Sequence, residues 1–83
     1  MNKEKVILIN TIDRVKRFTQ KVSVMDAEVD IVSGRYIVDA KSIMGIFSLD
    51  ILKPLTVIIH SEDEEEINKF NEIMEEFKVD DKS

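Results

Sequence analysis

The chain has 83 residues, of which 43% are hydrophobic and 35% are charged, with no cysteine and one histidine. This length suits a single domain over residues 1–83 with one modest core, and the lack of cysteine excludes disulfides and thiolate zinc sites. No apolar run reaches the roughly 20 residues that cross a bilayer, and the first residues lack the pattern of a signal peptide, so we expect a cytoplasmic protein without membrane contact, metal or cofactor.

The net charge of −5 is divided unevenly along the chain. Residues 1–24 hold six basic residues against two acids, whereas residues 61–83 hold ten acids against three lysines. Because the chain as a whole is acidic and its basic run contains one aromatic residue, Phe18, we expect no nucleic-acid binding. Solvated helix faces explain both runs, and docking of the basic run to an acidic protein is the alternative.

The first quarter of the chain predicts a strand and then a helix. Residues 6–9 are β-branched or apolar on both faces, which is typical of a central strand. From residue 12 to about residue 24, apolar residues recur every three or four positions, which predicts a helix that Asn10 or Thr11 can cap. The residues on the apolar face of this helix are Val15, Phe18, Val22 and Met25.

A hairpin and a short helix are predicted next. Residues 27–31 alternate between apolar and acidic side chains, which indicates a strand with one wet face. A turn at residues 33–35 leads to its hairpin partner at residues 36–40. Residues 41–51 follow as a short helix that closes before Pro54.

The last part of the chain predicts a strand at residues 55–60 and a final helix. Ser61 and Glu64 have the spacing of a capping box for this helix. Each predicted helix has one apolar face, so all three must lie on one face of a four-stranded, mainly antiparallel sheet. This is an α+β open-faced sandwich. The apolar residues of the final helix are Ile67, Phe70, Met74 and Phe77.

The segment KSIMGIFSL, residues 41–49, combines a serine, a glycine and closely spaced apolar residues. It closely resembles the regulatory-serine segment of HPr, the histidine-containing phosphocarrier protein of the bacterial sugar phosphotransferase system. The predicted order of elements is similar to the HPr fold over nearly the whole chain. The resemblance implies that Ser42 is the serine that a dedicated kinase phosphorylates in many Gram-positive bacteria, and that the apolar residues beside it contact partner proteins.

The resemblance also locates a departure from the family at the start of the first helix. The family's phosphocarrier histidine lies there, and the alignment puts Thr11 in its place and Asp13 in place of an arginine. A second alignment, through Ile12, puts Asp13 in place of the histidine. Relay requires an imidazole nitrogen that carries and releases phosphate, whereas a threonine phosphate is a stable ester and an aspartate repels the incoming anion. We therefore expect the relay chemistry to be lost.

Two other features of the chain suggest phosphate or acid–base chemistry. His60 lies on the same side of its predicted strand as Thr56 and Ile58. This position near the strand end predicts a partly exposed histidine rather than a phosphate acceptor. Residues 62–66 are five consecutive acids. Their favourable interaction with the positive end of a helix dipole is a simpler explanation for this run than a catalytic pair or a cation site.

The segment around Ser42 carries the predicted regulatory site. A serine before a helix is a common N-cap, which by itself explains this residue, and a phosphate there would add a charge of about −2 beside apolar side chains. Because so short a helix has only one inward face, some of its apolar residues must be exposed. We assign Ile43, Met44 and Phe47 to partner binding and expect Met44 and Phe47 to be exposed.

We therefore predict a non-enzymatic, HPr-like regulatory or adaptor protein with no catalytic residue, similar to the catabolite-repression paralogues of HPr. Its expected partners are proteins: a serine kinase, components of the phosphotransferase system or a transcription regulator. The alternative is an active phosphocarrier that uses Thr11, Asp13 or His60. A structural domain without phosphate chemistry is the third possibility.

Overall fold

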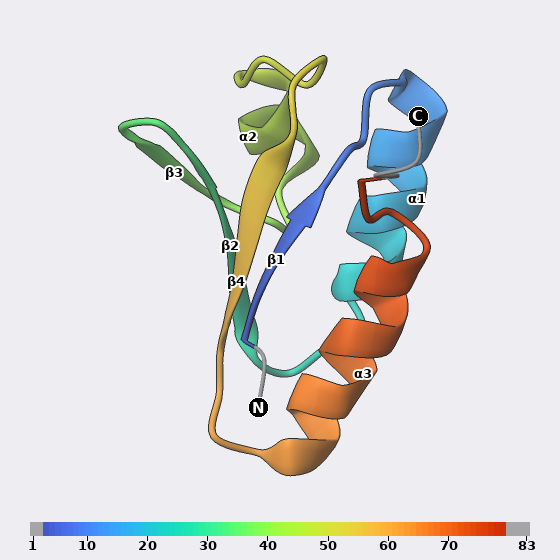
Figure 1. Cartoon of the computed structure of the whole chain (residues 1–83), viewed down its shortest axis with the longest axis vertical. Helices are drawn as coiled ribbons and strands as arrows, with labels where there is room; N and C mark the ends of the chain where they lie inside the picture. The colour runs from blue at the N-terminus through green and yellow to red at the C-terminus, as the bar shows by residue number, and fades with distance from the viewer. Residues whose placement is uncertain (1–2, 80–83) are drawn as a thin grey trace.

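The computed structural model describes residues 3–79, so residues 1, 2 and 80–83 of the predicted domain lie outside the described part of the chain (Figure 1). Its four strands form one sheet in the order β1-β4-β2-β3, and every neighbouring pair is antiparallel. The elements in chain order are β1 (Glu4–Ile7), α1 (Ile12–Val22), β2 (Glu28–Ser33), β3 (Tyr36–Asp39), α2 (Ile43–Phe47), β4 (Leu55–His60) and α3 (Glu64–Glu75).

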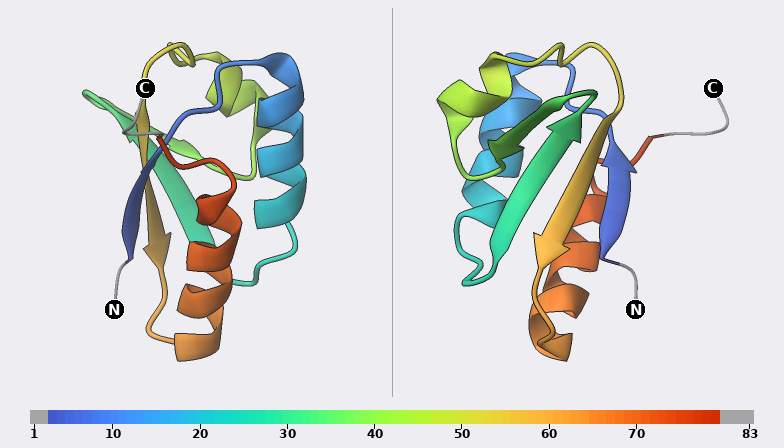
Figure 2. Two further views of the ribbon diagram at one scale, coloured as in Figure 1. Left: turned by 45° about the vertical axis from the view of Figure 1, so that its right-hand side comes forward. Right: turned by 90° about the vertical axis from the view of Figure 1, so that its left-hand side faces the viewer.

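The predicted open-faced sandwich is confirmed. The long helices α1 and α3 lie side by side against one face of the sheet, and α2 packs against α1 and β3 (Figures 1 and 2). The predicted apolar faces of both long helices are buried against the sheet, because each helix offers apolar side chains along one side only. Inward-facing residues of the sheet complete the core: Ile7, Val29, Ile31, Leu55, Val57 and Ile59.

The first strand is an edge strand, so the prediction of a central strand at residues 6–9 was wrong. β1 pairs only with β4 among the strands, and a single bridge joins Ile7 to Lys78. Val6 on its other face is 49% exposed. β4 takes the central place instead, because its register lets it pair with both β1 and β2. Apolar side chains on both faces of a strand therefore do not by themselves mean that both faces are buried.

The start of α3 also differs from the predicted capping box of Ser61 and Glu64. Asp63 is the N-cap, and its carboxylate accepts a hydrogen bond from the backbone N–H of Glu65 at 3.0 Å. Ser61 instead accepts a bond from the backbone N–H of Asp63. Both residue types cap helices well, and Asp63 immediately precedes the first helical residue, Glu64. Its negative charge also suits the positive end of the helix.

Candidate functional site

Ser42 is the N-cap of α2, as the sequence predicted. Its hydroxyl oxygen accepts a hydrogen bond from the backbone N–H of Gly45 at 3.1 Å, and its own N–H donates to the carbonyl oxygen of Asp39. Lys41 directly before it donates from Nζ to the carbonyl oxygen of Met25 at 2.7 Å. The half-buried serine is thus fixed at the junction between β3 and α2.

Gly45 allows α2 to lie close to β3. A Cβ atom at this position would be 3.3 Å from the hydroxyl oxygen of Ser42 and 3.4 Å from Cβ of Val38. The first distance is tighter than ordinary contact and the second is ordinary, so an added methyl group would crowd the hydroxyl group of Ser42. The absence of a side chain at Gly45 therefore leaves room for the Ser42 hydroxyl at the start of α2.

The apolar residues of α2 divide between the core and the solvent. Ile46 is fully buried, and Ile43 is partly buried against the core. Met44 is 77% exposed and Phe47 is 39% exposed, which confirms the predicted exposure of both. A helix of five residues has one inward face, and the two isoleucines fill it. Apolar surface therefore faces the solvent within two residues of Ser42.

Thr11 and Asp13 lie at the start of α1. Thr11 is the N-cap, and its hydroxyl oxygen accepts a bond from the backbone N–H of Arg14 at 3.1 Å. Asp13 is exposed in the first turn, where its charge favours the helix dipole. Capping therefore accounts for Thr11, and the helix dipole accounts for Asp13.

Arg14 has a structural role that the sequence reasoning missed. Its guanidinium donates two hydrogen bonds to the carbonyl oxygen of Leu8, at 3.1 Å from Nε and 2.8 Å from a terminal nitrogen. The same group lies 5.5 Å from the ring centre of Phe77, within the range of a cation–π contact. The cation nearest in sequence to Thr11 is therefore engaged with the loop after β1 and with the core.

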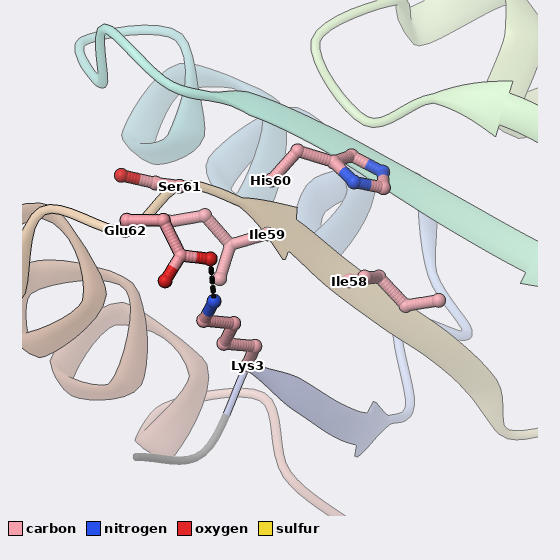
Figure 3. A pocket seen from close by; sticks show the side chains of 6 residues that line it. All are labelled: Lys3, Ile58, Ile59, His60, Ser61 and Glu62. Carbon is pink, nitrogen blue, oxygen red and sulfur yellow. Dashed lines mark hydrogen bonds and ion pairs between the residues drawn. The ribbon is translucent and has the colours of Figure 1, made fainter.

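His60 ends β4 on the face of the sheet opposite the buried side chains of that strand. Its side chain is 51% exposed, and Nε2 lies 2.8 Å from a carboxylate oxygen of Asp30 on β2. An open depression beside it is lined in part by Lys3 and Glu62, whose ion pair spans 2.5 Å (Figure 3). The lysine's hydrogen bond and charge lower the pKa of the Glu62 carboxyl.

The candidate residues gather at opposite ends of the molecule. α2 lies beside the N-terminal end of α1, so Ser42 and Thr11 belong to neighbouring elements at one end (Figure 2). β4 runs away from that end and places His60 at the other, where it pairs with Glu28 at the start of β2. The structure therefore groups two of the three candidate regions and separates the histidine from them.

Within residues 3–79, no group of three or more histidine or acidic side chains is arranged to hold a metal ion. No helix in the same part of the chain is long and apolar enough to cross a membrane.

Comparison with known proteins identifies the class to which this fold and site belong. A family model described as the HPr component phosphorylation site of the phosphotransferase system matches residues 14–78, a range that includes Ser42 and begins after Thr11 and Asp13. The chain is thus a phosphocarrier-like protein of the phosphotransferase system. It belongs to the HPr family.

Two solved structures share its architecture. HPr-C-His from Thermoanaerobacter tengcongensis is 27% identical, with a TM-score of 0.70 over 89% of this chain and 92% of that chain. The phosphocarrier protein HPr from Bacillus anthracis str. Ames is 23% identical, with a TM-score of 0.72 over 90% of this chain and 95% of that chain. Among curated protein sequences, none matches this chain.

Proposed function

We propose that this chain is a regulatory or adaptor member of the HPr family that does not relay phosphate. It contacts protein partners through Ile43, Met44 and Phe47 of α2, and phosphorylation of Ser42 switches that contact. The observation that carries the proposal is the 77% exposure of Met44 two residues after the capping serine.

The exposed side chains suit a protein interface. A methionine adapts its shape to the partner, and an aromatic ring offers a large area with little conformational freedom to lose on binding. Ile43 and Ile46 anchor the helix to the core, so a partner can cover Met44 and Phe47 without any change in the fold. Family membership favours proteins of the phosphotransferase system as partners, and a serine kinase or a transcription regulator is the further expectation.

Phosphorylation of Ser42 would act on this surface through its charge. The phosphoryl group adds about −2 charge within two residues of Met44. The ammonium group of Lys41, the nearest base in sequence, donates one hydrogen bond to the carbonyl oxygen of Met25, and its single charge offsets only part of the phosphate charge. The new charge therefore favours partners with basic groups around the apolar contact and disfavours partners that present acids there.

The loss of phosphate relay rests on the start of α1. Thr11 and Asp13 supply a hydroxyl and a carboxylate where relay needs an imidazole and a cation, and Arg14 is bonded to Leu8 and stacked on Phe77. The second candidate function is phosphate relay on Thr11, Asp13 or His60. Among these residues, the pairing with Asp30 favours His60. The carboxylate orients the imidazole through Nε2, so Nδ1 is the ring nitrogen that would accept the phosphate.

Two phosphorylation reactions followed by mass spectrometry separate these functions. Phosphoenolpyruvate with the first enzyme of the phosphotransferase system should add no acid-labile phosphate, whereas the serine kinase with ATP should label Ser42. Ser42→Ala should abolish kinase labelling, and Ser48→Ala is the matched control that should retain it. Acid-labile phosphate on His60, or an acyl phosphate on Asp13, would establish relay instead.

Two variants extend the test. Thr11→His should restore little transfer, because Asp13 still repels the phosphate, and efficient transfer by this variant would contradict the charge argument. Met44→Ala combined with Phe47→Ala should weaken binding to a phosphotransferase-system partner by at least about tenfold. Unchanged binding would remove α2 from the interface.

A further inference from the structure

The sheet has a second surface, which we call the outer face: the side turned away from α1 and α3. The right-hand view of Figure 2 looks onto it. Strand pairing aligns its side chains in rows across all four strands, because paired residues point to the same side of a sheet. The described strand residues of this face are Glu4, Val6, Glu28, Asp30, Val32, Ile37, Asp39, Thr56, Ile58 and His60.

One of these rows has aliphatic side chains at three of its four positions, with Thr56 at the fourth, and we call it the apolar row. Val6 pairs with Thr56, Thr56 with Val32, and Val32 with Ile37. The two ends are open to solvent, with Val6 at 49% and Ile37 at 67% exposure. Among the described strand residues of the outer face, Ile58 adds a further aliphatic side chain in the next row.

Four of the five remaining strand positions of the outer face are acidic, and the fifth is His60. Glu4, Asp30 and Asp39 occupy the row beside the apolar row, and Glu28 pairs with His60 in the row beyond. Asp30 is bonded to His60, and Asp39 accepts a hydrogen bond from the backbone N–H of its neighbour at position 41. None of the described strand residues on this face is a lysine or an arginine. The face is therefore apolar along one line and negatively charged beside it.

We propose that the outer face binds a basic amphipathic helix of a protein partner. Neighbouring strands lie about 4.8 Å apart, so the three aliphatic positions of the apolar row and the methyl group of Thr56 match apolar side chains that are three and four residues apart on a helix lying across the strands. Lysine and arginine residues along one side of that helix would meet the acidic rows.

The charge of the outer face discriminates between occupants. Nucleic acids and anionic membranes carry the same sign as Glu4, Glu28, Asp30 and Asp39, so both are repelled. A second copy that presented the same face would bring no lysine or arginine from its strands to pair with these acids. The proposal does not depend on α2 or Ser42, and it gives the protein a second docking surface beyond the one proposed above.

A designed peptide tests the proposal on the full chain. The probe is a helix-forming peptide of about 18 residues, long enough to be helical, with leucines three and four residues apart on one face and lysines beside them. Its binding is followed by fluorescence anisotropy and its site by amide chemical shifts. We expect shifts at Val6, Val32, Ile37 and Thr56, and affinity that falls as salt is raised.

Variants and a reversed-charge peptide decide the outcome. Ile37→Ser should weaken binding by about tenfold, Glu28→Gln should weaken it by a few fold, and Val24→Ser, at a 71% exposed residue beyond the end of α1, should change nothing. The same peptide with glutamates in place of lysines should not bind. Shifts confined to α2, equal binding of the acidic peptide, or a dimer in sedimentation that Ile37→Ser abolishes would each overturn the proposal.

Discussion

Truncating the side chains of Met44 and Ile46 in α2 tests how the helix divides between the core and the surface. Met44→Ala should leave the stability of the domain almost unchanged, whereas Ile46→Ala should destabilise it strongly. The two residues lie two positions apart in one five-residue helix, so the comparison keeps the local backbone constant. It isolates burial, which is complete for Ile46 and slight for Met44.

The expected magnitudes follow from these exposures. Met44 is 77% exposed, so about a quarter of its side chain is removed from water, which is worth about 0.5 kcal/mol. The higher helix propensity of alanine offsets a few tenths of this loss, roughly. Ile46 is fully buried, and removing its side chain costs about 2–5 kcal/mol in transfer and cavity energy. In a domain of this size, about 1 kcal/mol shifts Tm by about 4–8 °C.

Thermal and urea unfolding followed by circular dichroism measure both variants. Met44→Ala should change Tm by at most about 4 °C, whereas Ile46→Ala should lower it by about 8 °C or more. If Ile46→Ala does not fold, Ile46→Val serves instead, with an expected loss of about 0.5–1.5 kcal/mol. A cost for Met44→Ala equal to that of the isoleucine variant would refute the assignment of Met44 to the surface and remove the basis of the proposed interface.

Three further predictions concern the N-cap of α2, the turn between β2 and β3, and the carboxylate of Glu66. Ser42→Ala should lower the free energy of unfolding by about 1 kcal/mol through loss of the bond to the Gly45 N–H, and an unchanged urea midpoint would argue against the cap. Gly34→Ala should cost about 1–2 kcal/mol, because φ is +60° there and no neighbouring atom crowds the new methyl group; urea unfolding measures it, and a neutral result would contradict the turn. Hydrogen bonds from the backbone N–H groups of Ala27 and its neighbour hold the pKa of the Glu66 carboxyl below its ordinary value, although burial opposes this. A lowered pKa gives stability that is present above the ordinary pKa, about 4.3, and that is lost as the pH falls through the folded-state pKa. Glu66→Gln should therefore flatten the decline of Tm at acidic pH. An unaltered decline would exclude this linkage.

The sequence determined the features that depend on near neighbours along the chain. Apolar spacing and turn residues predicted four strands and three helices in the observed order, and the spacing identified buried residues such as Phe18 and Phe70. Ser42 was recognised as a cap because capping is a local hydrogen bond to a backbone N–H three residues away. The segment of residues 41–49 also carried the resemblance to the HPr family, to which the chain belongs.

Only the tertiary structure decided which distant segments meet. Strand order decides the central place of β4. Tertiary packing likewise brings Arg14 to Leu8 and Phe77, and strand register brings His60 within hydrogen-bond distance of the Asp30 carboxylate. Alternation along a strand shows which side chains share a face, but it does not show which strand lies next to it. The apolar row from Val6 to Ile37 exists for the same reason: its four residues become neighbours only when the strands pair in this register.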